Sequence, residues 1–163
     1  MIERTLVLLK PDAVKRGVMG EIIARFEKVG MKIVALRLAW VSEEKAKAHY
    51  TEDIAIRRGE HVRNYLVDFI TSGPVLAFVV EGVDAIENVR MMVGATEPKS
   101  AIPGTIRGDY SHVSYSHADA EKKVVANLIH ASADKADAER EIYVWFNEDE
   151  IFDYKTAYEA HTL

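Results

Sequence analysis

The chain has 163 residues, with 21 Lys and Arg against 26 Asp and Glu, and its net charge of −5 argues against a general binder of nucleic acids or acidic membranes. Since the sequence contains no cysteine, disulfides, zinc–thiolate sites and thiol nucleophiles are excluded. Apolar residues make up 48% and charged residues 29%, which is the balance of a folded globular protein, and the length predicts one domain over residues 1–163.

Targeting signals are weak in this sequence. The apolar run near the N-terminus ends at Lys10 and Pro11, so it is too short for the core of a signal peptide. The longest apolar run, Val75 to Val80, is far shorter than the roughly 18 residues of a membrane span. We therefore expect a cytoplasmic protein that does not enter a membrane.

The first third of the chain predicts a strand, a helix and a second strand. Residues 5–9 form a short apolar run that ends in the turn sequence Lys-Pro-Asp. Apolar residues then recur at helical spacing from Met19 to Val29, and Gly30 stands where a helix ends. Residues 31–41 are rich in β-formers and apolar on both faces, which favours a central strand.

The rest of the chain alternates helices and strands. Ser42 can cap a short helix that runs to Tyr50. After the polar stretch 51–60, a helix is expected up to Gly73-Pro74. The remaining expectations are a buried strand over 75–80, a helix over 84–93, an ordered loop over 94–111, a fourth strand over 124–129 and a closing helix over 135–146.

This order of elements predicts an α/β protein, specifically an α+β sandwich. Four strands covered by helices on one side match the ferredoxin-like type, with a four-stranded antiparallel sheet. Simple alternation of strands and helices also allows a small doubly wound sheet.

Arg90 breaks the apolar pattern of its predicted helix. The residues Ile86, Val89 and Val93 define a buried stripe, and Arg90 lies along the same stripe. A guanidinium in that position needs a carboxylate, a carbonyl or a bound anion. The alternative is an Arg side chain that extends past the edge of the core.

His130 directly follows an apolar strand, and Glu141 lies on the flank of the apolar stripe of the last helix. Glu141 can therefore face back towards His130. A carboxylate that orients an imidazole activates it as a nucleophile or a base. The simpler alternatives are a histidine packed at the edge of the core and a solvated charge on a helix.

Two further cations stand near predicted strand ends or loops. Lys10 ends the first strand, at the edge where open α/β folds tend to place ligands, and Arg107 lies in a loop with two glycines. Together with Arg90, they provide the composition of a polyphosphate clamp. The sequence contains no P-loop, G-x-G-x-x-G or H-E-x-x-H motif, and the spacing of His112 and His117 does not suit a metal site.

Residues 127–132, NLIHAS, resemble the active-site signature of nucleoside diphosphate kinases, in which Asn and two apolar residues precede His, Gly or Ala, and Ser. Further segments are similar to the same family, occur in the family order and span nearly the whole chain. They are TLVLLKPDAVKRG at 5–17, GEIIARFEKVGMKI at 20–33, HY at 49–50, FITSGPV at 69–75, VRMMVGATEP at 89–98, PGTIRGDYS at 103–111 and AEREIYVWF at 138–146.

The resemblance implies a ping-pong kinase. His130 would take the γ-phosphoryl group from a nucleoside triphosphate as a phosphohistidine and pass it to a nucleoside diphosphate, with Mg²⁺ held mainly by nucleotide phosphates and water. Ser132 and Glu141 would orient His130, and Lys10 would serve both catalysis and binding. The residues implied to contact the nucleotide are Lys10, Tyr50, Val62, Leu66, Arg90, Thr96, Arg107 and Asn127. A homo-oligomer, commonly a hexamer, is also implied, with the loop around Pro98 near a subunit contact.

The chain departs from the family pattern at three places. Ala131 and Ala133 alter the residues beside His130, and Ala131 fits only if its φ stays negative. The segments near 51–61 and 110–126 are longer than usual, and the nearest counterpart of the base-stacking aromatic is Val62. We interpret the second insertion as a surface elaboration near the nucleotide or a subunit contact, and we do not assign base contacts to it.

Strand geometry adds a condition to the predicted site. Strict alternation places Asn127 and His130 on opposite faces of a strand, so both serve one site only if the strand begins after Asn127 or contains a bulge. The alternative functions are a catalytically silent nucleotide-binding or scaffold relative and an unrelated regulatory domain of ferredoxin-like fold. Retention of His130 together with Lys10, Arg90, Arg107 and Asn127 favours the enzyme.

Overall fold

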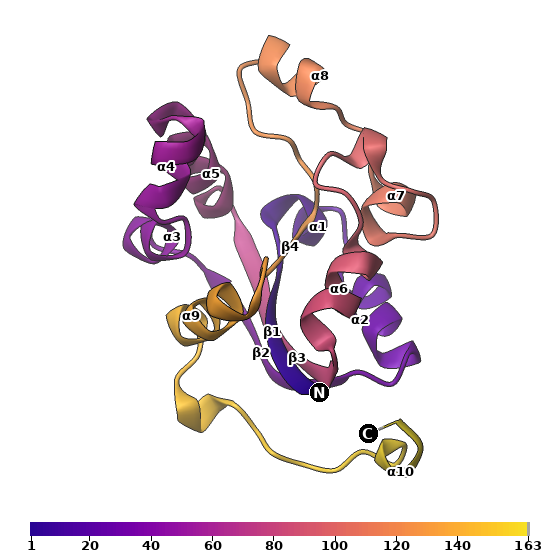
Figure 1. The fold of residues 1–163 in the computed structure, drawn as a ribbon. Helices are drawn as coiled ribbons and strands as arrows, with labels where there is room; N and C mark the ends of the chain where they lie inside the picture. The colour runs from indigo at the N-terminus through magenta and orange to yellow at the C-terminus, as the bar shows by residue number, and fades with distance from the viewer. Residues whose placement is uncertain (163) are drawn as a thin grey trace.

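The computed structural model describes residues 1–162, and a four-stranded antiparallel sheet with the strand order β2-β3-β1-β4 lies at its centre (Figure 1). The strands are β1 (Ile2–Leu9), β2 (Lys32–Trp40), β3 (Pro74–Val83) and β4 (Ile129–Ala131). The order and directions confirm the ferredoxin-like α+β sandwich and exclude a doubly wound parallel sheet.

Helices surround this sheet in both halves of the chain. The first half contains α1 (Pro11–Lys15), α2 (Met19–Lys28), α3 (Glu43–His49), α4 (Glu52–Arg58) and α5 (Glu60–Thr71). The second half contains α6 (Ala85–Val93), η1 (Pro98–Ser100), α7 (Ile106–Tyr110), α8 (Tyr115–Ala120), α9 (Lys135–Trp145), η2 (Glu148–Glu150) and α10 (Glu159–Thr162).

The helices cover both faces of the sheet, so the expectation of one covered side is wrong. Leu6 and Leu8 of β1 pack in a core with residues of α3, α5 and α9. Val7 and Leu9 point to the opposite face and pack in a second core with residues of α2 and α6. The consecutive apolar residues of β1 are fully buried because each face of this strand has its own core.

The strand β2 lies at an edge of the sheet, which corrects its predicted central place. It pairs only with β3. In its second half the burial alternates, so that Leu36, Leu38 and Trp40 are exposed on one face. Residues 31–41 are therefore apolar on both faces because one face of β2 forms an apolar outer surface. No second strand is needed to explain the pattern.

The fourth strand begins later than predicted, because the backbone turns sharply at Leu128. Its φ is +69°, and the N–H of Ile129 donates to the carbonyl of Asn127 at 2.8 Å, which closes a γ-turn. The N–H of Leu128 donates to the Asp12 carboxylate at 2.9 Å, and the N–H of Lys10 donates to the Leu128 carbonyl at 2.8 Å. Regular pairing is therefore restricted to residues 129–131.

Several short helices lie in segments expected to be turns or loops, namely α1, α4, α7 and α8. The predicted cap of α3 is confirmed, since the Ser42 hydroxyl accepts from the N–H of Lys45 at 3.2 Å. In the described range of the chain, no helix is long and apolar enough to cross a membrane.

Candidate active site

The predicted binding residues meet at one cavity of about 1370 Å³, which lies between α5 on one side and α6, α7 and α8 on the other. His130 lines it together with all eight residues that the sequence assigned to the nucleotide. Ser132 and Glu141 do not line the cavity and are buried behind His130. The structure thus brings together residues that lie far apart in the sequence, from Lys10 to His130.

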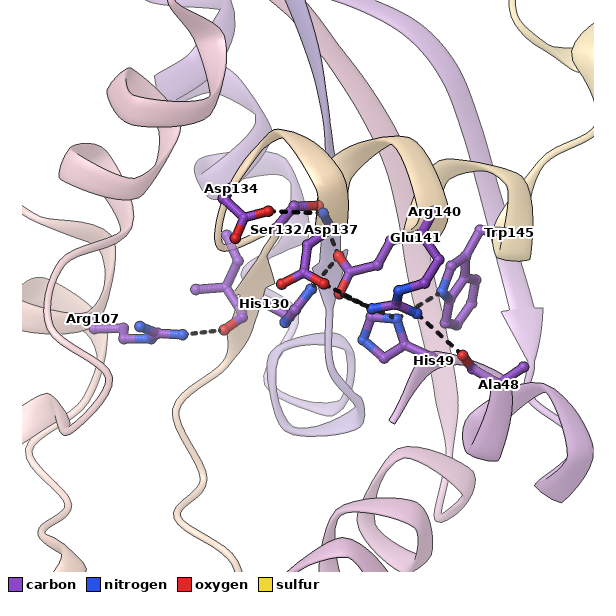
Figure 2. Close-up of polar contacts among 11 residues, drawn as sticks. Ala48, His49, Arg107, His130, Ser132, Asp134, Asp137, Arg140, Glu141 and Trp145 are labelled. Carbon is purple, nitrogen blue, oxygen red and sulfur yellow. Dashed lines mark hydrogen bonds and ion pairs between the residues drawn. The ribbon is translucent and has the colours of Figure 1, made fainter. Parts of the chain in front are cut away.

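His130 lies on β4 beside Leu8 of β1, and its ring is held by a carboxylate. Its Nε2 lies 2.8 Å from Oε2 of Glu141, as Figure 2 shows. Because an ionised carboxylate accepts hydrogen bonds, we assign the ring proton to Nε2. Nδ1 makes no hydrogen bond within residues 1–162, so its lone pair is available for chemistry.

Glu141 is buried in α9 and stays ionised. Burial raises its pKa, but the hydrogen bond from His130 and the neighbouring histidines outweigh burial and hold the pKa at about 2. The Ser132 hydroxyl also donates to Oε2 of Glu141, at 2.7 Å. Ser132 can therefore orient His130, as the resemblance implied, through the carboxylate.

His49 is a member of this cluster that the sequence analysis missed. It ends α3, is buried, and its ring meets the ring of His130 edge to face with centroids 4.5 Å apart. Its Nδ1 accepts from Nε1 of Trp145 at 3.4 Å and lies 3.9 Å from Oε1 of Glu141 (Figure 2). Burial holds the pKa of His49 well below its usual value, so this imidazole is neutral. The pair HY at 49–50 was the available signal, but only Tyr50 was selected from it.

Lys10 and Asn127 form a buried pair at the floor of the cavity. Nζ of Lys10 donates to Oδ1 of Asn127 at 2.7 Å, and Nδ2 of Asn127 donates to the carbonyl of Thr96 at 2.8 Å. Burial, together with the charge of Arg107, lowers the pKa of Lys10 to about 8. Since β4 begins after Asn127, this side chain and that of His130 both line the cavity, as the strand geometry required.

Arg107 is buried and tied to the backbone around the reactive strand. Its guanidinium donates to the carbonyls of Gly94 at 3.0 Å, Asn127 at 3.3 Å and Ile129 at 2.6 Å. Burial lowers its pKa to about 10, so the group is still charged at neutral pH. Arg107 thus joins α6, the turn before β4 and β4 itself.

Arg90 lies on α6 but not on its buried stripe, which corrects the predicted placement. The buried residues of this helix are Ala85, Val89 and Val93, whereas Arg90 is exposed and lines the cavity. Val89 and Val93 are buried as predicted, but Ala85 takes the place of Ile86 in the stripe, and Ile86 lines the cavity as Arg90 does. Arg90 makes no hydrogen bond or ion pair within the described chain, and its charge is therefore available to an anion.

The cavity is locally cationic although the whole chain is acidic. Six Lys or Arg residues and four Asp or Glu residues line it. Ala131, beside His130, is not among the residues with positive φ, so the Ala that replaces the usual Gly is not strained.

A metal ion has one candidate protein cluster in residues 1–162. His49, His130 and Glu141 offer ligand atoms within 4.8 Å of one another. Two of the three ligands are nitrogens, whereas Mg²⁺ prefers oxygen, so the cluster does not fit Mg²⁺. His112 and His117 do not join any such cluster among the described residues.

A histidine with one free nitrogen, an ionised carboxylate behind it and a cationic cavity in front define a phosphotransferase of the phosphohistidine type. The family model described as nucleoside diphosphate kinase matches residues 3–151. The chain therefore belongs to the nucleoside diphosphate kinase family. It is an enzyme that transfers the γ-phosphoryl group of a nucleoside triphosphate to a nucleoside diphosphate.

Individual relatives are similar in sequence to this chain over nearly its whole length. A nucleoside diphosphate kinase of Borreliella burgdorferi is 51% identical over 156 residues, which cover 95% of this chain and 93% of the relative. The enzyme of Pyrococcus abyssi is 52% identical, with 95% and 91% covered.

A solved structure of a Borrelia burgdorferi nucleoside-diphosphate kinase, described as a transition-state mimic with bound vanadate and ADP, has a TM-score of 0.97 at 49% identity. The match covers 99% of this chain and 96% of that one. An enzyme of Pyrobaculum aerophilum has a TM-score of 0.87 at 40% identity, with 94% of this chain and 100% of that chain covered.

Proposed function

We propose that Nδ1 of His130 is the nucleophile of this enzyme. It attacks the γ-phosphorus of a nucleoside triphosphate, the bond from this phosphorus to the bridging oxygen breaks, and the nucleoside diphosphate leaves. A β-phosphate oxygen of a second diphosphate then attacks the phosphohistidine and restores His130. The hydrogen bond between Nε2 and Glu141 carries this proposal, because it leaves Nδ1 unprotonated at the cavity.

Glu141 stabilises the charge that develops on the ring. When Nδ1 binds phosphorus, the imidazole becomes cationic while Nε2 keeps its proton. The ionised carboxylate 2.8 Å away compensates this charge without giving up or taking a proton. Ser132, whose hydroxyl donates to the same oxygen, positions the carboxylate.

The phosphates are bound by the cationic side of the cavity. Among residues 1–162 Arg90 has no hydrogen bond or ion pair, and Lys10 and Arg107 are charged at neutral pH and line the same cavity. A loose phosphoryl-transfer transition state needs little beyond positioning and neutralisation of its oxygens, and these three groups provide both. Tyr50, Thr96 and Asn127 provide neutral contacts, while Val62 and Leu66 present apolar surface to the base.

Enzymes of this family use a divalent cation. We propose Mg²⁺ for this chain, held mainly by the nucleotide phosphates and water, because the one protein cluster in the described residues does not suit it. The bound ion neutralises phosphate charge. All other contacts in the mechanism come from the residues above.

Self-association is part of the proposal. The exposed face of the edge strand β2, with Leu36, Leu38 and Trp40, is suited to a second copy of the chain, and Ile102, near Pro98, is also exposed. We propose a homo-oligomer, with the hexamer as the expected form, built from one kinase domain per chain. The cytoplasmic location stays a prediction from the sequence.

Incubation with γ-labelled ATP, without an acceptor, tests this function. The wild-type enzyme and the control His117→Ala should both form an acid-labile, base-stable phosphoenzyme that discharges when a nucleoside diphosphate is added. His130→Ala should take up no label. Labelling of His130→Ala at the wild-type level would remove His130 from the mechanism, and an unlabelled wild type would favour the silent relative.

A further inference from the structure

The segment 110–126, which is longer than in the family pattern, forms one wall of the cavity. Five of its residues line the cavity, and they face α5 from the opposite side: Tyr115, Asp119, Lys123, Val124 and Val125. In Figure 1, the helix α8 stands across from α4 and α5, above the strand β4. This position agrees with an elaboration near the nucleotide, one of the two alternatives that the sequence left open.

The segment is attached to the loop that precedes η1. The backbone N–H of Tyr115 donates to Oε1 of Glu97 at 2.8 Å, and the N–H of Lys99 donates to the carbonyl of Val113 at 3.1 Å. The Ser114 hydroxyl caps α8 by accepting from the N–H of His117 at 3.2 Å. The start of α8 is therefore fixed next to Thr96, which immediately precedes Glu97 and lines the same cavity.

Tyr115 is the aromatic residue that the inserted segment presents to the cavity. Its side chain is 40% exposed, and its hydroxyl makes no hydrogen bond within residues 1–162. Tyr115 lines the same cavity as Arg107, whose guanidinium is charged at neutral pH. A phenolic hydroxyl that lines a cationic cavity and has no partner among the described residues is suited to an anionic oxygen.

We propose that Tyr115 is a nucleotide-binding residue, whose hydroxyl donates a hydrogen bond to a phosphate oxygen of the nucleoside di- or triphosphate beside Arg107. The inserted segment thus contributes to the substrate site. This assignment rests on the proposed function, since it takes the cavity to be the nucleotide site. Because the contact is to phosphate, it does not discriminate among bases.

The test compares Tyr115→Phe with the wild-type enzyme. The phenylalanine keeps the ring and removes only the hydroxyl, so the fold should be preserved. We expect Kd for ADP, GDP, CDP and UDP to rise by a similar factor, roughly tenfold, which is typical for loss of a hydrogen bond to a charged group. Tyr143→Phe is the matched control, because Tyr143 is 65% exposed on α9 and does not line the cavity.

Two results would overturn the assignment. Unchanged Kd values in Tyr115→Phe would remove the hydroxyl contact. A weak effect of Tyr115→Phe combined with a base-dependent loss in Tyr115→Ala would show that the ring stacks on the base and that the hydroxyl does not bind phosphate. Phosphoenzyme formation by the wild type, measured in parallel, separates failure of this inference from failure of the proposed function.

Discussion

Glu141 is the residue through which the structure controls the reactivity of His130. The carboxylate receives hydrogen bonds from both the imidazole and the Ser132 hydroxyl, and it is ionised at any pH at which the enzyme works. Because one oxygen holds both partners, the ring orientation and the position of its proton depend on a single buried charge. The neutral ring of His49 packs against the other side of this arrangement.

Replacement of Glu141 by Gln should lower kcat more than it raises KM. The amide keeps the shape of the side chain but lacks the charge that stabilises the cationic ring, so we expect a loss of about 10²-fold in kcat, as for other lost electrostatic contacts in active sites. Steady-state kinetics with a saturating triphosphate measure it. Glu139→Gln, at an exposed carboxylate of the same helix that does not line the cavity, is the control. Wild-type kcat in Glu141→Gln would contradict the role of the carboxylate.

Deprotonation of Lys10 should weaken nucleotide binding at alkaline pH. Burial lowers its pKa to about 8, so the charged form prevails below this pH and is lost above it. A polyanionic substrate binds the charged form of Lys10 better. Because the pH dependence of kcat/KM reports the ionisation of groups in the free enzyme, kcat/KM should fall as the pH rises through about 8. The descending limb should disappear in Lys10→Met, at a lower level of activity. A limb that persists in this variant would assign the titration to another group.

The single residues of the site were largely predictable from the sequence, because polar groups interrupted apolar patterns. Glu141 faces His130 as its place beside the apolar stripe suggested. We predicted that Arg90 could bind an anion because it lies near the buried stripe of its helix. It lies just beside that stripe, and its guanidinium forms no hydrogen bond or ion pair among the described residues. His49 was not selected, since a histidine at the end of a helix gives no pattern that distinguishes it from a surface residue.

The elements position the site through a few backbone features. The γ-turn at Leu128 lets Asn127 and His130 line one cavity, although they are three residues apart. The start of β4 was not predictable, because residues 124–129 are mostly apolar and the turn is stabilised by Asp12 and Lys10, which are far away in the sequence. The long helices α2, α5, α6 and α9 were predictable, since their apolar periodicity is strong.

Gly108 is required by the packing of α7. A Cβ at this position would lie 2.2 Å from the carbonyl oxygen of Ile102. Gly108→Ala should therefore displace the loop that carries Arg107, at a cost of about 1–3 kcal/mol in the free energy of unfolding, and weaken nucleotide binding. Denaturant unfolding and ADP titration measure the two effects. Gly20→Ala in α2 is the control, because a Cβ added there would have no side chain or other element of the described chain within 4 Å. Equal stability of the two variants would contradict this account.

At the scale of the whole molecule, the outer face of β2 predicts self-association. Leu38 is exposed on β2, a strand at the edge of the sheet that pairs with β3 alone among the described strands. Leu38→Glu should shift the protein to smaller species in sedimentation velocity, because a buried carboxylate without a partner destabilises an interface. Ile56→Glu, an exposed position on α4, is the comparison. An unchanged sedimentation coefficient in Leu38→Glu would exclude this face as an interface.

The net charge of −5 describes the outer surface of the molecule, whereas the cavity concentrates cations for a polyanionic substrate. Composition alone therefore excluded a general nucleic-acid binder but did not indicate a nucleotide enzyme. The conclusion that the chain is a nucleotide enzyme came from the sequence motifs and from the cavity in which Lys10, Arg90 and Arg107 lie with His130.

The site of phosphorylation is the most direct test of the mechanism. Phosphorus NMR of the phosphoenzyme, formed from ATP and kept at alkaline pH, distinguishes the two ring nitrogens of a phosphohistidine. The hydrogen bond from Nε2 to Glu141 predicts phosphorus on Nδ1 of His130. Phosphorus on Nε2, or on any residue other than His130, would contradict the account.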